Sequence, residues 1–373
     1  MIFRCDLQPQ YEAYKTEIDR AVTGVLSSGR YTLAQEGARF EEEFARYCGV
    51  KHAVAVGSGA DALILSLKAL AVGPGDEVIT TPFTAIPTVS AILAAGAKPV
   101  FVDIRPDTFL MDLDQVKQAL SPRTKAVVPV HIFGNMVDVP RLKSIVGNKI
   151  YIVEDAAQAH GSTFQGMSAG SMGHCGAFSF YPTKNLGAYG DGGMVVTNDG
   201  SLAEHLKLLR TYGMIDKDHI VINGFNSRLD EIQAAILRVK LRYLDEMNQK
   251  RQVIAERYRS TCPSDYLEWQ KISDNSANNY HVLVAKVESG RDEFIQYLNQ
   301  KSIQTNIYYV MPVYQQKANE FLGVSPGEHP QVEELCQQVI ALPMYPELKP
   351  DVLDYIINTV NCFHKEHYDR SRR

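Results

Sequence analysis

The sequence predicts an α/β protein with a large domain built on a mostly parallel central sheet and a smaller C-terminal α+β domain. First, short apolar segments alternate with segments of helical periodicity between residues 52 and 211, as in strand-helix-strand units. Second, a long helical segment and a shorter mixture of strands and helices follow. Third, 373 residues with 45% apolar content can fill one large core and one smaller core. We therefore expect domains at residues 1–245 and 246–373.

The large domain is expected to open with two amphipathic helices, because apolar residues recur at helical spacing around Ile18 and again around Phe44. Alternating elements then follow: strand His52–Val56, helix Ala60–Ala71, strand Glu77–Thr80, helix Pro87–Ala95, strand Pro99–Asp103, helix Leu113–Leu120, strand Lys125–Ile132, helix Val139–Val146, strand Ile150–Glu154, strand Cys175–Phe180, strand Met194–Thr197 and helix Leu202–Thr211. This alternation predicts a sheet covered by helices on both faces.

A long helix is expected to join the two domains. Ser227-Arg-Leu-Asp230 has the form of a capping box, and apolar residues continue on one face to about Arg259. The second domain is then expected to contain strand Tyr280–Lys286, helix Asp292–Lys301, strand Gln304–Tyr308 and helix Val332–Ala341. The charged segment His364–Arg373 is expected to fray.

Composition argues against several classes of protein. Net charge is −5, with 38 basic and 43 acidic residues and no basic cluster, so we expect no nucleic-acid partner. The first ten residues lack an apolar signal core and no long window is apolar enough for a membrane span, so we expect a cytoplasmic protein without a membrane partner. Six separated cysteines are expected to stay reduced. Cys362, His364 and His367 resemble a metal cluster, but they lie in the charged tail, so we expect no metal.

Lys184 is the residue from which a function can be inferred. It follows the apolar strand Cys175–Phe180 and precedes a loop with four glycines between Gly187 and Gly193. An ordinary lysine is a solvated surface charge, but these flanks predict a partly desolvated amine. Desolvation lowers the pKa of an amine and frees its lone pair for Schiff-base chemistry.

Asp155 is expected to face the same crevice. It ends the apolar strand Tyr151–Asp155, and Lys184 follows 29 positions later. In open parallel sheets, ligands bind beyond the carboxyl ends of the strands. A carboxylate that keeps a ring nitrogen protonated and a lysine that carries the aldehyde are the two groups that pyridoxal 5'-phosphate (PLP) requires. Together they predict a PLP enzyme.

The segment Gly57-Ser-Gly-Ala-Asp-Ala62 follows a strand and opens a helix, so its backbone N–H groups form an anion site. It also matches a dinucleotide fingerprint, with Glu77 standing 20 positions beyond Gly57 as an acidic ribose ligand. A NAD(P)-dependent oxidoreductase is therefore an alternative, although it leaves Asp155 and Lys184 unused. A non-catalytic ligand-binding regulator on the same scaffold is a second alternative. A structural turn could also explain these glycines.

The chain resembles the DegT/DnrJ/StrS sugar-nucleotide aminotransferases nearly from end to end. The likeness rests on long collinear motifs: residues 40–59, Gly73-Pro-Gly-Asp-Glu-Val-Ile79, Gly96-Ala-Lys-Pro-Val-Phe-Val-Asp103, Glu154-Asp-Ala-Ala-Gln-Ala-His160, the lysine loop, Gly224-Phe-Asn-Ser-Arg-Leu-Asp-Glu231 and Leu342-Pro-Met-Tyr345. The resemblance implies PLP fold type I, the fold of aspartate aminotransferase, and a homodimer with active sites built from both subunits.

The resemblance also assigns roles to residues. It implies that Lys184 is the Schiff-base lysine and proton shuttle, that Asp155 meets the pyridinium, and that Gln158 lies on the side of the ring hydroxyl. Gly59, Ala60 and Ser179 would hold the phosphate, with Asn226 reaching in from the partner chain. Tyr181, Arg228, Tyr308 and Tyr309 are expected to contact the substrate, although tyrosines in core strands are as often packing residues.

Three departures from the family pattern stand out. Ala60 replaces a usual threonine, so backbone groups must hold the phosphate there. Thr84 is followed by Ala85 where an aromatic residue commonly stacks on the ring, which leaves open whether Phe83 or Ala85 faces the cofactor. Ile307-Tyr-Tyr-Val310 stands where relatives often have His-Tyr-Pro, in the segment expected to face the sugar.

The lysine loop, residues 181–193, is similar to that of enzymes that aminate a 3-keto-6-deoxyhexose on a nucleoside diphosphate, usually dTDP. Relatives that act on 4-keto sugars carry a different run after the lysine, and relatives that dehydrate carry histidine in its place. The resemblance therefore implies transfer of an amino group from L-glutamate to C3 of a dTDP-linked keto sugar, with a 4-keto sugar as the alternative.

Overall fold

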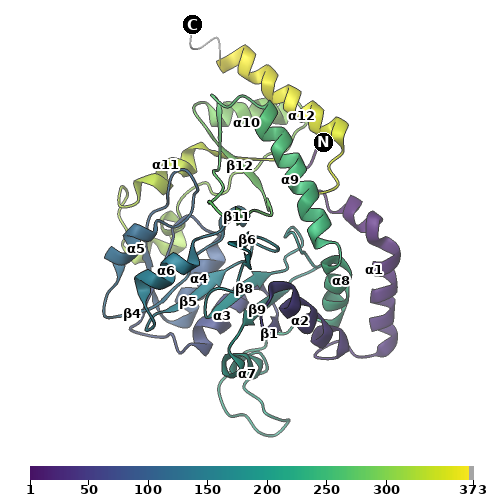
Figure 1. Ribbon diagram of the computed structural model, residues 1–373, viewed down its shortest axis with the longest axis vertical. Helices are drawn as coiled ribbons and strands as arrows, with labels where there is room; N and C mark the ends of the chain where they lie inside the picture. The colour runs from purple at the N-terminus through teal and green to yellow at the C-terminus, as the bar shows by residue number, and fades with distance from the viewer. Residues whose placement is uncertain (369–373) are drawn as a thin grey trace.

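The computed structural model describes residues 1–368. Its core is a seven-stranded sheet (Figure 1). The strands, in spatial order, are β1 (His52–Val56), β9 (Gly193–Thr197), β8 (Cys175–Ser179), β5 (Tyr151–Asp155), β4 (Thr124–Val127), β2 (Glu77–Thr80) and β3 (Lys98–Phe101). The predicted α/β class with a mostly parallel sheet is confirmed.

The direction of the strands decides where a ligand can bind. From β8 to β3 every neighbouring pair is parallel, whereas β9 runs antiparallel to both β8 and β1. Because β1 is reversed twice relative to β8, it points the same way as β8 and β5. The carboxyl ends of β1, β5 and β8 therefore meet at one edge of the sheet, the edge at which open α/β sheets bind ligands.

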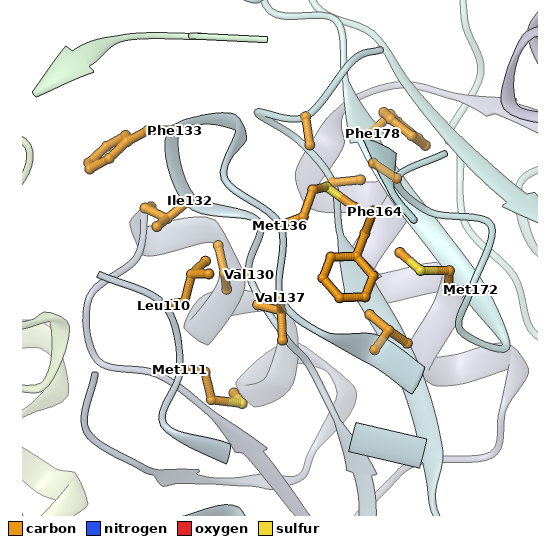
Figure 2. Packing of buried hydrophobic residues seen from close by; sticks show 14 of the residues in the cluster. Leu110, Met111, Val130, Ile132, Phe133, Met136, Val137, Phe164, Met172 and Phe178 are labelled. Atoms are coloured by element: carbon orange, nitrogen blue, oxygen red, sulfur yellow. The ribbon is translucent and has the colours of Figure 1, made fainter. Parts of the chain in front are cut away.

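Helices cover both faces of this sheet. They are α1 (Gln8–Ser28), α2 (Gln35–Cys48), α3 (Gly59–Ala69), α4 (Ile86–Ala95), α5 (Leu113–Ala119), α6 (Val139–Val146), α7 (Gly200–Leu209) and α8 (Glu231–Leu241). Neighbouring strand residues point to opposite faces, so Ile152 and Val153 belong to different apolar clusters. Figure 2 shows part of the larger cluster, where Phe164 and Met172 pack near Phe178 of β8. Both faces of the sheet are therefore buried, as is typical of parallel sheets.

The rest of the chain forms a second unit around an antiparallel sheet of β10 (Leu267–Trp269), β12 (Leu283–Val287) and β13 (Val339–Leu342). Its helices are α9 (Leu244–Thr261), α10 (Arg291–Gln300), α11 (Pro330–Gln338) and α12 (Pro350–Phe363). A third small sheet of β11 (Ser276–Ala277), β6 (Thr163–Phe164) and β7 (Met167–Ser168) links segments of both units. Short 3-10 helices lie at η1 (Ile132–Gly134), η2 (Val313–Gln315) and η3 (Lys317–Leu322).

We propose that the two domains divide near residue 245, as expected. Ile254 and Tyr258 of α9 belong to the apolar cluster of the second sheet, whereas Ala234 and Leu237 of α8 belong to the cluster of the large sheet. The N-terminus also reaches the second unit, because Ile2 forms a parallel bridge with Ile303.

The predicted long helix from Ser227 to about Arg259 is wrong. The chain breaks between α8 and α9, where Tyr243 stacks on Tyr14 of α1 with ring centroids 4.4 Å apart. Ser227 does not cap α8 either: its hydroxyl accepts from the Gly57 N–H at 2.9 Å. Tertiary contacts therefore override the local helical pattern at both positions.

Three predictions in the second domain are also corrected. Within the described residues, segment Gln304–Tyr308 forms a single bridge, Asn306 with Ala341, beside the edge strand β13, and not a full strand. The predicted helix Val332–Ala341 ends at Gln338, and the chain continues as β13, whose Ile340 and Leu342 belong to the core of the second unit. Part of the predicted frayed tail, His364–Tyr368, forms a π-helical turn, and residues 369–373 lie outside the described residues. Within residues 1–368, no helix has the length and apolar character needed to cross a membrane.

Candidate active site

Asp155 lies at the predicted edge of the sheet, at the carboxyl end of β5, and is almost fully buried. Its Oδ2 accepts from the Thr88 hydroxyl at 2.7 Å, and its Oδ1 accepts from the Ala157 N–H at 3.2 Å. Burial raises the pKa of this carboxyl, while the two hydrogen bonds and the charge of Lys184 act in the opposite direction. The carboxylate is thus held in one orientation and lacks a closely bound cation.

Lys184 follows β8, and a turn in which its N–H donates to the Tyr181 carbonyl at 2.8 Å begins the lysine loop. The side chain keeps some exposed surface, yet the surrounding protein lowers the pKa of its amine to about 8. Desolvation is the main cause, and the charge of Asp155 opposes it. The two groups follow neighbouring parallel strands, β5 and β8, at the same edge of the sheet, and the charge of each acts on the pKa of the other.

The predicted phosphate cradle is assembled from two strand ends. Ser58 caps α3, and its hydroxyl accepts from the Asp61 N–H at 3.1 Å. A Cβ on Gly59 would lie 2.5 Å from Cβ of Ser179, so the start of α3 touches the end of β8. The first N–H groups of a helix have no partner within it, so those of Gly59 and Ala60 are available to an anion beside Ser179.

Gln158 is held by the protein at both ends of its amide. Its Oε1 accepts from the Phe133 N–H at 2.7 Å, and its Nε2 donates to the Tyr309 hydroxyl at 3.2 Å. Tyr309 therefore lies next to a predicted cofactor residue. The neighbouring Tyr308 instead accepts a hydrogen bond from Nη1 of Arg4.

The remaining predicted residues lie in more exposed places. The backbone of Arg228 lies beside Gly57, next to the phosphate cradle. Tyr181 is 54% exposed. Asn226 is exposed in the segment after α7, which projects from the large domain (Figure 1). Within residues 1–368, no side-chain hydrogen bond joins Asn226 to Lys184 or Asp155.

Glu77 contradicts the dinucleotide alternative. It begins β2, at the opposite end of the strands from Gly57, and its carboxylate is bound by the Ser121 hydroxyl and by Arg123. Hydrogen bonds from these groups lower the pKa of Glu77 despite its burial. An acidic group at the amino end of its strand cannot meet a ribose bound at the carboxyl ends.

Several site residues were not predicted from the sequence. Thr88 orients Asp155 and is itself hydrogen-bonded to Thr84, with 2.8 Å between the hydroxyl oxygens. Glu154 accepts from three backbone N–H groups of the segment 170–173 and pairs with His131, with 2.8 Å between Oε2 and Nε2. This clamp fixes the end of β5. The position of Thr88 in the first turn of a helix at the ligand edge was the available signal.

His160 is a further unpredicted residue. It is fully buried between Phe178 and Phe180, with ring centroids 5.2 and 5.8 Å from its own. Burial and the charge of Lys184 lower the pKa of its imidazole to about 3, and the Ser179 backbone opposes this shift only in part. The ring is therefore neutral at physiological pH.

Comparison with known proteins agrees with this geometry. Residues 12–361 match the DegT/DnrJ/EryC1/StrS aminotransferase family. A dTDP-3-amino-3,4,6-trideoxy-alpha-D-glucose transaminase of Micromonospora megalomicea subsp. nigra is 44% identical over 94% of this chain and 96% of its own. A pleiotropic regulatory protein of Geobacillus stearothermophilus is 40% identical over 96% of this chain and 98% of its own.

The same relationship holds for the fold. The crystal structure of S. venezuelae DesV in complex with a ketimine intermediate has a TM-score of 0.94 to this structure at 40% identity, covering 98% of this chain and 99% of that one. The predicted PLP fold type I is therefore confirmed, and the family is PLP-dependent. The chain belongs to the DegT/DnrJ/EryC1/StrS aminotransferase family and is a PLP-dependent sugar-nucleotide transaminase.

Proposed function

We propose that this protein transfers the amino group of L-glutamate, through PLP, to C3 of a dTDP-linked 3-keto-6-deoxyhexose. The observation that carries the proposal is a buried carboxylate, Asp155, at the end of β5 beside a desolvated amine, Lys184, in the loop after the neighbouring strand β8. The dTDP sugar and the C3 position are supported by the similarity to a transaminase whose product is a 3-amino sugar. A 4-keto sugar is the alternative substrate.

The residues present fit PLP. A Cβ on Gly59 would collide with Ser179, so the glycine lets the start of α3 approach the end of β8 and brings the first N–H groups of the helix beside Ser179, where a phosphate would be held. Burial without a close cation raises the pKa of Asp155, and a protonated ring nitrogen would supply the missing positive charge. When bound, PLP supplies an electron-withdrawing ring that stabilises negative charge on the reacting carbon.

Lys184 performs two tasks in this proposal. It holds the aldehyde carbon of the cofactor in the resting enzyme, and once free it moves a proton between carbon centres. A pKa of about 8 means that a useful share of the amine is neutral near pH 7 to 8. The neutral imidazole of His160 adds no competing positive charge beside it.

The aromatic position over the ring differs from the family pattern. Phe83 is 0% exposed and packs edge to face against Phe133 and Tyr309, with ring centroids 5.9 and 5.6 Å away. We therefore assign the contact with the ring to the methyl group of Ala85, which caps α4 at the ligand edge. Phe83 instead supports Tyr309, which binds Gln158.

The active protein is proposed to be a cytoplasmic homodimer with shared active sites. The segment after α7 carries Ile215 and Ile220, which are 65% and 64% exposed, on either side of a projecting turn. Covering these side chains with a second copy would remove apolar surface from water. Asn226 would then reach the phosphate of the partner, with Tyr181 and Arg228 contacting the sugar nucleotide.

The cofactor and the donor are tested by spectroscopy of the purified protein. We expect a visible absorption band that borohydride bleaches, that Lys184→Ala abolishes and that L-glutamate discharges. A band that no amine donor discharges would instead favour a ligand-binding regulator. Absence of any band after incubation with PLP would refute the proposal.

The position of amination is tested by a product assay. dTDP-linked 3-keto and 4-keto 6-deoxyhexoses are offered side by side with L-glutamate, and NMR locates the amine in each product. We expect amination of the 3-keto sugar. Faster conversion of the 4-keto sugar would replace the substrate while leaving the transaminase assignment intact.

A further inference from the structure

A narrow cavity with both polar and apolar walls adjoins the lysine loop. It is lined by Arg4 of the N-terminal segment, by Thr183 directly before the catalytic lysine, and by His281, Asn306 and Tyr308 of the second domain. Its volume of about 20 Å³ is room for one water-sized group. A sugar cannot enter, but one oxygen of a small ligand can.

Arg4 is a half-buried cation with a fixed backbone. Its N–H donates to Oε1 of Gln304 at 3.1 Å, and its carbonyl accepts from the Met344 N–H at 3.1 Å. Nη1 donates to the Tyr308 hydroxyl, and the guanidinium carbon lies 5.8 Å from the centroid of that ring. No carboxylate within residues 1–368 forms an ion pair with the guanidinium. A half-buried guanidinium without an anionic partner is suited to bind an anion from solution.

The hydroxyl of Tyr308 strengthens this anion site. Because the oxygen accepts from Arg4, its own proton remains available to another acceptor. The guanidinium and the phenol therefore present donors from adjacent positions. Two donors that converge on one point suit one oxygen of a carboxylate, the group for which the cavity has room.

The electrostatic potential at this cavity is positive, as the binding of an anion requires. The pKa of His281 is held well below its ordinary value, first by burial and then by the positive charges of Lys184, Arg251 and Arg4. His281 is itself fixed by Asn185, with 3.1 Å between Nδ1 and Oδ1. The cations that add to this lowering of the pKa also attract an anion to the cavity.

We propose that Arg4, with the hydroxyl of Tyr308, binds a carboxylate of the amino donor and thereby directs the donor amine to Lys184. This inference rests on the proposed transaminase function. Of the two proposed substrates only L-glutamate carries carboxylates, since the anionic groups of the sugar nucleotide are phosphates. Arg4 is therefore a specificity residue for the donor half of the reaction.

The test uses the holoenzyme and measures the two half-reactions separately. In Arg4→Met we expect the second-order rate constant for discharge of the visible band by L-glutamate to fall by about 10- to 100-fold, through weaker donor binding. The reverse half-reaction with a dTDP-linked amino sugar should keep its rate. Arg4→Lys, which keeps the charge, should recover part of the loss.

Binding without chemistry gives a second readout. Glutarate has two carboxylates and no amine, so calorimetry with the holoenzyme reports carboxylate binding alone. We expect Arg4→Met to weaken glutarate binding by about tenfold or more. Arg257→Met, which removes an exposed arginine paired with Asp354, is the matched control and should leave both readouts unchanged.

The outcomes separate this inference from the function on which it rests. If L-glutamate does not discharge the band of the wild-type protein, the proposed function fails first. If it does, and Arg4→Met binds L-glutamate and glutarate as tightly as wild type, the role of Arg4 is overturned. If Arg4→Met is unstable, Tyr308→Phe replaces it: a several-fold loss in glutarate binding supports the site, and no loss contradicts it.

Discussion

The cofactor side and the substrate side of this active site are built differently. On the cofactor side, Asp155 is bound by Thr88 and Ala157, and Glu154 clamps the strand end behind it. On the substrate side, the side chain of Tyr181 is exposed and makes no hydrogen bond within residues 1–368. The carboxylate of the first region is positioned by its own chain, whereas the tyrosine of the second region has no partner until a substrate binds. Chemistry common to the family thus rests on a rigid region, and choice of substrate rests on an adaptable one.

The largest effect, and so the sharpest test of this comparison, is expected when the amine of Lys184 is removed. Lys184→Met should lower the rate of the full reaction by about 10⁴-fold, because the proton transfers lose their base. The rate of amino-sugar formation measures this loss. Lys207→Met, which changes an exposed lysine paired with Glu204, should have no effect. A variant of Lys184 that retains a tenth of the activity would contradict the assignment.

The buried charge of Lys184 should also destabilise the folded protein when no cofactor is bound. The pKa of Lys184 is about 8 in the folded state and starts from an ordinary value of 10.5. Below pH 8 the amine is protonated in both the folded and the unfolded chain, so the folded protein bears the full cost of burying the charge. Between pH 8 and 10.5 the amine loses its proton in the folded chain first, so the free energy of unfolding rises with pH. Lys184→Met should therefore stabilise the protein by about 2–3 kcal/mol at pH 7.

Urea unfolding of the PLP-free wild type and variant at pH 7 and pH 10 measures this gain. The gain should shrink at the higher pH. A gain that is equal at both values, or a loss at pH 7, would argue against a desolvated amine.

The phosphate cradle offers a smaller effect. In Gly59→Ala the added Cβ would lie 2.5 Å from Cβ of Ser179. This distance is too short for two carbon atoms, so the end of β8 must shift. We expect the Kd for PLP to rise by about tenfold or more, through loss of one or two hydrogen bonds to the phosphate. Gly24→Ala in α1, where the methyl meets open space, is the control and should leave PLP binding unchanged. Fluorescence titration of the stripped protein measures both.

The smallest effect is expected on the substrate side. Tyr181→Phe removes one hydroxyl from an exposed side chain, so the KM for the sugar nucleotide should rise by about two- to fivefold. Discharge of the visible band by L-glutamate should stay unchanged. If the glutamate half-reaction slows instead, Tyr181 belongs to the rigid region and the comparison fails.

The central features of the fold were predictable because each has a local cause. β5, which ends at Asp155, and β8, which precedes Lys184, are short, mostly apolar segments followed by polar or glycine-rich turns. Their type and position therefore follow from the sequence. Elements of the second domain were less predictable. Val339–Leu342 reads as the end of a helix, and only its pairing with β12 makes it a strand.

The break at Tyr243 has the same explanation. Its segment continues a helical pattern, but stacking on Tyr14 of a distant helix ends α8 there. Local propensity differs by less than about 1 kcal/mol per residue, so one stacked aromatic pair can outweigh it.

The sequence by itself determined the chemistry of this protein: a desolvated amine after one strand, a carboxylate at the end of another, and a helix start suited to phosphate. Only the tertiary structure decided how these groups are oriented and what lies around them. Thr88, His131 and Arg4 act across long sequence separations, and no local pattern marks such partners. Residues that take part in the reaction lie in recognisable local sequence patterns, whereas residues that position them can be identified only from contacts in the folded chain.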